Sequence, residues 1–160
     1  MEHRQVNVVC WYSEQTGNGE TLPLVIFLHG GLGTAIRNVS LYRDLASHGY
    51  VVCSIGHPSH ALWTKSEEGH LIFVSPEYVG ELQREDARTD KLGSLCVYQK
   101  WLQICTAAIN LVIDIMLAKT VAGAEGMYML MDSSRIGVME HSLDGSAALA
   151  IPGSVMILMP

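Results

Sequence analysis

The chain has 160 residues, of which 49% are hydrophobic and 16% are charged, so it is long and apolar enough for one domain with a buried core. Its net charge of −6, without a run of lysines and arginines, excludes nucleic acid and anionic membrane surfaces as expected partners. It contains neither a signal-peptide pattern nor an uncharged apolar run of about 18 residues, so we expect no membrane span and a cytoplasmic location.

Strand and helix patterns alternate in the first part of the chain. Residues 6–12 (VNVVCWY) predict a strand, and residues 16–23, rich in Gly, Asn and Pro, predict a turn. The continuous apolar run at 24–28 is typical of a strand that is buried on both faces, as in a parallel sheet. Residues 36–49 then predict an amphipathic helix, and residues 50–58 a second buried strand. This succession predicts a strand–helix–strand unit of a parallel sheet.

The middle of the chain has an irregular segment followed by a long helical pattern. Residues 59–90 are polar and irregular, so we expect a long loop, in which 71–74 (LIFV) is either a short strand or a hydrophobic plug. From about 91 to 119 the apolar residues recur at helical spacing. Their stripe is broad, so we expect this helix to be buried on more than one side.

The last part of the chain predicts two more strands. Asp132, or one of the serines after it, is expected to close a turn before a strand at 135–140 (RIGVME). A helix is expected at 142–151 and a fourth core strand at 154–159 (SVMILM). The fold class is therefore α/β, with a parallel-dominated sheet of four to six strands and helices on both faces. We expect the strand at 24–28 to lie in the middle, between the strands at 50–55 and 135–139.

The cysteines and histidines do not form a metal-binding motif. Cys10, Cys53, Cys96 and Cys105 are widely spaced without a Cys-x-x-Cys pair, so we expect four free thiols in a reducing compartment and Cys53 as a small buried apolar group. His57 and His60 have a spacing that a metal could use, but no further ligands complete a tetrahedral site. We expect no metal and no cofactor.

Three segments together resemble the α/β-hydrolase fold: LPLVIFLHGGLG (22–33), LASHGYVVCSIGHPSHA (45–61) and SSRIGVMEHSLDGSAALA (133–150). Within that fold they are most similar to the dienelactone hydrolase and platelet-activating-factor acetylhydrolase-like branch. The resemblance covers about residues 20–151, and it implies one incomplete hydrolase-like domain over residues 1–160.

The resemblance also implies a site. Ser142 matches the nucleophile, at a turn before a helix, and the backbone N–H groups of Gly31 and Leu143 match the oxyanion hole, with Leu32 as the next candidate. Two such donors stabilise the charge that develops on a tetrahedral intermediate. The implied activity is hydrolysis of carboxylic esters, with a small ester or lipid-like substrate. Without the resemblance, the His-Gly-Gly segment and the turn around Ser142 would read as ordinary turns.

Two departures weaken this implication. Glu140 and Asp144 stand where the family has glycines, and each brings a Cβ and a negative charge beside the expected oxyanion. After Ser142 the sequence has no histidine, and its only acid is Asp144, so the triad acid and base are missing. We therefore expect a C-terminally truncated hydrolase with weak activity or none.

Two alternatives to a truncated hydrolase stay open. One is a non-catalytic ligand-binding or interaction module derived from a hydrolase. The other is an enzyme completed by another chain. For the truncated hydrolase, the apolar strand expected at 155–159 is predicted to lie at an open sheet edge, and such an edge favours self-association.

Overall fold

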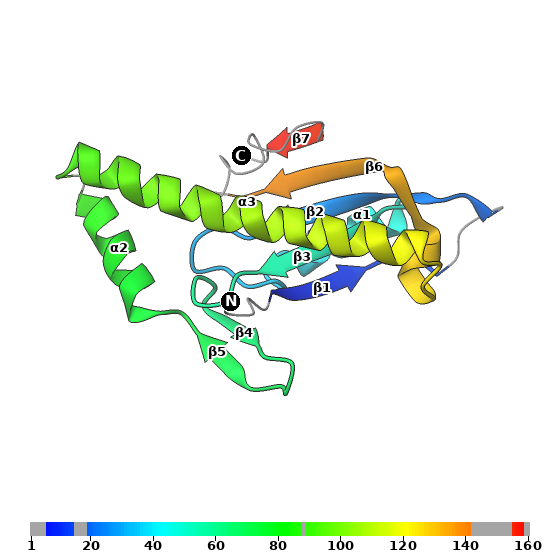
Figure 1. Ribbon diagram of the computed structural model, residues 1–160, viewed down its shortest axis with the longest axis horizontal. Coiled ribbons are helices and arrows are strands. Elements are labelled where there is room, and N and C mark those ends of the chain that lie inside the picture. Colours follow the sequence, from blue (N-terminus) through cyan, green and yellow to red (C-terminus); the bar gives the residue numbers. More distant parts are fainter. Residues whose placement is uncertain (1–5, 15–18, 88, 142–154, 159–160) are drawn as a thin grey trace.

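A mostly parallel sheet forms the centre of the molecule (Figure 1). The computed structural model describes residues 6–14, 19–87, 89–141 and 155–158. The sheet has five strands in the order β1-β3-β2-β6-β7. Their bounds are β1 (Asn7–Trp11), β2 (Leu22–Leu28), β3 (Val51–Gly56), β6 (Met131–Glu140) and β7 (Val155–Leu158). Only β1 runs antiparallel to its neighbour among these strands.

The central place of β2 confirms the prediction from its continuous apolar run. It pairs in parallel with β3 on one side and with β6 on the other. Leu24, Ile26 and Leu28 are fully buried on one face, and Val25 and Phe27 are buried on the other. A strand that is apolar at every position is stable only between two covering layers, which explains why β2 occupies the middle of the sheet.

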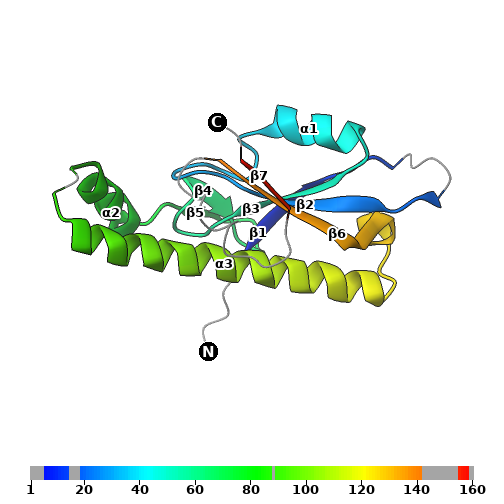
Figure 2. The same ribbon diagram turned by 90° about the horizontal axis from the view of Figure 1, so that it is seen from above.

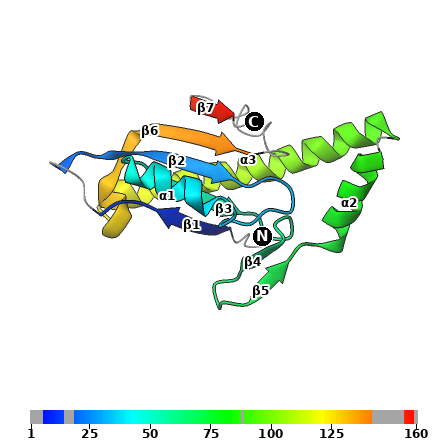
Figure 3. The same cartoon turned by 180° about the vertical axis from the view of Figure 1, so that it is seen from behind.

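Helices cover both faces, as predicted (Figure 2). On one face, α1 (Val39–Ser47) packs Tyr42 against Val25 and Phe27, and Figure 3 shows α1 lying over β2 and β3. On the opposite face lies α3 (Lys91–Val121), whose Cys105, Ile109 and Val112 belong to the larger core cluster. The two apolar faces of the sheet are thus buried in two separate layers.

The helix α3 departs from the prediction in its burial. Its buried residues form one stripe, Val97, Trp101, Cys105, Ala108, Ile109, Val112 and Met116, whereas Leu111 and Ile115 are 39% and 43% exposed. Within the described part of the chain, α3 is therefore buried on one side only.

By length and composition, α3 could also cross a membrane, because its most apolar 18 residues have a mean hydropathy of 1.8. The core helix of a soluble protein can satisfy the same criterion, so the absence of a membrane span stays a prediction.

Residues 59–90 correct the expectation of an irregular loop. They contain an antiparallel hairpin, β4 (Trp63–Lys65) with β5 (Leu71–Phe73), and the helix α2 (Pro76–Ala87). The short strand within 71–74 is thereby confirmed. The signals for α2 are a proline at its first position and Ser75 before it, whose hydroxyl accepts a hydrogen bond from the Tyr78 N–H at 3.1 Å. The N-terminal cap therefore stabilises a helix in a polar segment that has no strong stripe of apolar residues.

The turn expected near Asp132 appears as an irregularity within β6, which follows a short 3-10 helix (Gly126–Leu130). The pairing of β2 passes from Pro23 opposite Asp132 directly to Leu24 opposite Ile136. The Asp132 carboxylate accepts hydrogen bonds from the Ser134 N–H at 2.8 Å and the Arg135 Nε at 2.6 Å. The turn therefore resets the register so that the apolar end of β6 lies beside β2.

Candidate functional site

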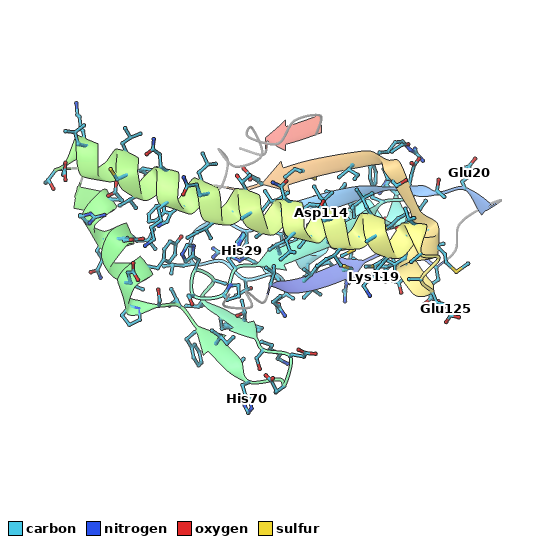
Figure 4. All side chains as sticks on the ribbon, in the orientation of Figure 1. Glu20, His29, His70, Asp114, Lys119 and Glu125 are labelled. Carbon is cyan, nitrogen blue, oxygen red and sulfur yellow. The ribbon has the colours of Figure 1, made fainter. Side chains whose placement is uncertain are left out.

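The carboxyl ends of the three central parallel strands meet at one edge of the sheet. Leu28 of β2 lies opposite Ile55 of β3 and opposite Glu140 of β6, so the residues that follow these strands gather there. Figure 4 labels His29 at this end of β2, and His57 follows β3. In open α/β sheets, ligands bind at this edge.

A tight turn directly follows β2. The Gly33 N–H donates to the Gly30 carbonyl at 2.8 Å, and Leu32 has a positive φ of 57°. A Cβ on Gly33 would lie 2.8 Å from the Gly30 oxygen and 2.8 Å from the His29 Cβ, closer than real Cβ atoms approach. The backbone is therefore folded on itself so tightly that residue 33 has to be glycine.

This turn leaves backbone donors available. Among the described residues, no backbone carbonyl accepts a hydrogen bond from the N–H of Gly31 or Leu32. Gly31 is half-buried, and Leu32 is 37% exposed. A donor that is held by a rigid turn at the carboxyl edge of the sheet meets the structural requirement for an oxyanion-hole group. Gly31 lies at the carboxyl edge of the sheet, and its role in an oxyanion hole stays a prediction.

His29 anchors the same turn. Its side chain is 2% exposed, and its Nδ1 lies 2.9 Å from the Gly30 carbonyl oxygen. Because a carbonyl only accepts, Nδ1 carries the proton and Nε2 carries the lone pair. Burial lowers the pKa of His29, and the charge of Arg37 lowers it further, so the ring is neutral near pH 7.

The neighbouring ring at this edge belongs to His57. It is 3% exposed, and the His29 and His57 rings meet edge to face with their centroids 5.7 Å apart. We predicted His57 as a solvated or core residue, and the structure identifies it as a core residue. The sequence signal for its position is that it directly follows the second parallel strand, as His29 follows the first.

Glu140 is the last residue of β6 and is 1% exposed. It lies opposite Leu28 on one side and opposite Leu158 on the other. Alternation along the strand puts its side chain on the same face as Val138, which belongs to the core under α3. The departure from the family glycine therefore puts a carboxyl group inside the molecule at the carboxyl edge of the sheet.

The other predicted site residues lie outside the described residues. They are Ser142, Leu143 and Asp144, and the helix expected at 142–151 lies outside them as well. His141 is the last described residue before them, and it is exposed. The nucleophile geometry, and the expectation that no histidine reaches Ser142, thus stay predictions.

Among the described histidines, cysteines and acidic residues, no group of three or more is arranged to hold a metal ion. The ring of His60 instead stacks on Tyr78, with the centroids 4.2 Å apart and the planes 6° from parallel.

A small pocket lies beside the turn. It has a volume of about 240 Å³ and is lined by Ala35, Ile36, Trp63, Val9, Asn7 and Lys65. Ala35 and Ile36 lie two and three residues after Gly33, and Asn7 of β1 lies opposite Gly56 at the carboxyl end of β3. The pocket is therefore at the same edge of the sheet as the turn, and it offers mostly apolar walls to a ligand.

The sheet order, the two helical layers and the glycine turn after β2 define an α/β-hydrolase-like protein. The family described as platelet-activating factor acetylhydrolase, isoform II, matches residues 3–154, and the chain belongs to this family.

Two comparisons with individual proteins agree with this assignment. The chain is 30% identical over 145 residues to platelet-activating factor acetylhydrolase of the dog, Canis lupus familiaris, covering 82% of this chain and 32% of that protein. A ferulic acid esterase from Streptomyces cinnamoneus has a similar fold, with a TM-score of 0.58 at 24% identity over 81% of this chain and 32% of that one. The chain thus spans about a third of the length of these relatives. The likeness to dienelactone hydrolases stays a prediction.

Proposed function

We propose that this chain supplies the nucleophile and oxyanion-hole part of a carboxylic-ester hydrolase site. The observation that carries the proposal is the tight turn at residues 30–33 at the carboxyl edge of the sheet, where no backbone carbonyl of the described residues accepts from the Gly31 N–H. Ser142 would attack the ester carbonyl carbon, and the N–H groups of Gly31 and Leu143 would hold the resulting oxyanion. Membership in an acetylhydrolase family supports the same chemistry.

The substrate class that we propose is a small ester or a lipid-like acyl ester. The matched dog protein is named an acetylhydrolase of platelet-activating factor, so the acyl group in that reaction is acetyl. A pocket of about 240 Å³ with apolar walls from Ala35, Ile36 and Trp63 lies beside the turn and fits a short apolar group. We therefore assign this pocket to a short acyl or leaving group.

We further propose that these 160 residues hydrolyse esters weakly or not at all when they act alone. Ser142 needs a general base, and no histidine follows it in this sequence. His29 has a lowered pKa, which makes its ring a weaker base than an ordinary histidine. A missing general base reduces the rate by about 10²–10⁴-fold, so the remaining activity should lie within about a hundredfold of background.

Hydrolysis of p-nitrophenyl acetate by the purified chain and by Ser142→Ala tests this proposal. We expect low, non-saturable release of nitrophenol that differs little between the two proteins. Replacing both acidic residues with glycine, Glu140→Gly with Asp144→Gly, should not restore turnover, because the base is still missing. Saturable turnover that disappears in Ser142→Ala would show a working catalytic site and overturn the proposed inactivity.

One observation favours a second candidate, a binding module without catalysis. Glu140 is fully buried at the functional edge, and a negative charge there would oppose an oxyanion. A module of this kind should gain thermal stability from a short-chain ester without hydrolysing it. A thermal shift with p-nitrophenyl acetate and with its non-hydrolysable ether analogue tests the binding module: equal shifts are expected, and no shift with either compound would exclude it.

A further inference from the structure

We propose that Cys10 and Cys53 are a redox-active dithiol that oxidises to a cross-strand disulfide between β1 and β3. The two residues are register partners in the antiparallel pairing of these strands. Their Sγ atoms lie 2.7 Å apart, with both cysteines free. The strand register and the contact between the side chains therefore bring these two cysteines together, although they are 43 positions apart in sequence.

The backbone is already suited to the bond. Directly opposed residues on antiparallel strands have their Cα atoms about 4.5–5.5 Å apart. A disulfide accepts Cα separations of about 4.4–6.8 Å, so β1 and β3 need not move when the bond forms. The sheet thus presents the two thiols in a bonding arrangement, and packing in the core keeps them there.

The two thiols differ in their exposure to solvent, and this difference determines which thiol an oxidant reaches first. Cys53 is fully buried, whereas Cys10 on the edge strand is half-buried. The contact with Cys10 and then burial raise the pKa of the Cys53 thiol, which favours its protonated form. An oxidant should therefore meet Cys10 first, and the closing step at Cys53 should be slow.

A low-molecular-weight disulfide such as oxidised glutathione is the oxidant class that we propose. The Cys10 thiolate attacks one sulfur of that disulfide, which forms a mixed disulfide and releases one glutathione thiolate. Cys53 then attacks the Cys10 Sγ, its proton passes to the departing glutathione thiolate, and the second glutathione leaves as a thiol. Two protein thiols are oxidised, and one glutathione disulfide is reduced to two thiols.

The bond would attach an edge strand to the rest of the sheet. Among the described strands, β1 has a single neighbour, β3, and within the five-stranded sheet it is the only strand that runs opposite to the others. A covalent link across 43 positions limits the unfolded chain more than the folded one. For a chain of this size we expect the oxidised form to melt about 10 °C higher than the reduced form.

The test uses the full chain, equilibrated over a series of reduced and oxidised glutathione ratios, denatured and alkylated with N-ethylmaleimide. We expect an intact mass about 2 Da lower than that of the reduced chain before alkylation, in line with the loss of two hydrogens. Peptide mapping should give Cys10 linked to Cys53, with Cys96 and Cys105 alkylated, and dithiothreitol should reverse the change. Alkylation of both Cys10 and Cys53 after oxidation, or linkage of either one to another cysteine, would overturn the proposal.

A matched pair of variants separates this bond from general oxidation. Cys96→Ser removes an exposed thiol on α3 and should keep both the linked peptide and the melting difference. Cys10→Ser should lose both. Because wild-type protein is compared with and without dithiothreitol, the test stands even if Cys10→Ser folds poorly. Equal melting temperatures of the linked and reduced wild-type chains would overturn the assigned role in holding β1.

Discussion

At the scale of single residues, the turn after β2 is the most constrained feature of the functional edge. Gly33 is required by close approach of backbone atoms, and His29 is required by burial and by its hydrogen bond to Gly30. Neither constraint depends on a bound ligand. The turn therefore keeps its shape without a ligand, which the proposed oxyanion hole would require.

We predict that Gly33→Ala destabilises the protein by about 1–3 kcal/mol, because the new Cβ would lie within 3 Å of backbone and His29 atoms. Gly80→Ala is the matched control. Gly80 lies in α2 with nothing within 4 Å of an added Cβ, so alanine there should stabilise by up to about 1 kcal/mol. Urea unfolding followed by circular dichroism measures both. Equal effects at the two positions would contradict the tight turn.

His29 makes a second prediction, for pH dependence. The folded-state pKa lies below the ordinary value of 6.5, mainly because the ring is buried. As the pH falls through 6.5, the unfolded chain takes up a proton that the folded chain resists, so the free energy of unfolding decreases.

His29→Asn keeps a donor for the Gly30 carbonyl but cannot titrate. Its free energy of unfolding should fall less between pH 7.5 and pH 5.5 than that of the wild type. Parallel losses in the two proteins would show that groups other than His29 carry the acid sensitivity.

At the scale of elements, α2 is held to α3 by a small polar cluster. Trp101 Nε1 donates to Glu81 at 2.7 Å, and Lys100 Nζ donates to Glu81 at 2.8 Å and to Glu77 at 2.7 Å. Burial raises the pKa of Glu81, but the hydrogen bonds from Lys100 and Trp101 outweigh it, and the net pKa is lowered. Glu81 therefore stays charged and orients the two helices.

The two acids of this cluster should differ in their contribution to stability. The Glu81 side chain is 13% exposed, and the Glu77 side chain is 74% exposed. We predict that Glu81→Ala destabilises by about 1–3 kcal/mol, because the buried Trp101 N–H loses its partner. Glu77→Ala breaks only a surface ion pair and should change stability by less than about 1 kcal/mol. Urea unfolding of both variants tests the order, and a larger loss in Glu77→Ala would contradict it.

At the scale of the whole molecule, the sheet presents an edge beyond β7. In the described sheet this strand pairs with β6 alone, as predicted for the fourth core strand. An edge strand offers unpaired backbone groups to another chain. We predict that the chain self-associates with rising concentration, which light scattering coupled to size exclusion detects.

A lysine in this strand is the control for the self-association prediction. Met156→Lys should shift the population toward the monomer, because a charge on an edge strand opposes pairing with a second edge. A reversible monomer near 17.5 kDa at every concentration, in the wild type as in the variant, would contradict the prediction.

Local patterns in the sequence were enough to predict much of this architecture. The apolar runs of β2 and β3 predicted adjacent buried strands, the helical stripes predicted α1 and α3, and the fold class predicted helices on both faces. These predictions hold because a strand that is apolar at every position has to be covered on both sides. The same reasoning did not predict the helix α2 within residues 59–90. This helix depends on a capped N-terminus rather than on a stripe of apolar residues.

Some features of the candidate site could be predicted from the sequence, and others could not. The glycines after the buried strand β2 predicted a turn there, and the structure has one, closed by the Gly33 N–H and the Gly30 carbonyl. The assignment of Gly31 to an oxyanion hole came from the family resemblance, and it stays a prediction. Only the tertiary structure decided that His29 and Glu140 are buried at one edge and that Cys10 faces Cys53. Burial and contact between positions far apart in sequence depend on which strands pair and in which register. Those pairings are set by the packing of the whole sheet, which no local stretch of residues encodes.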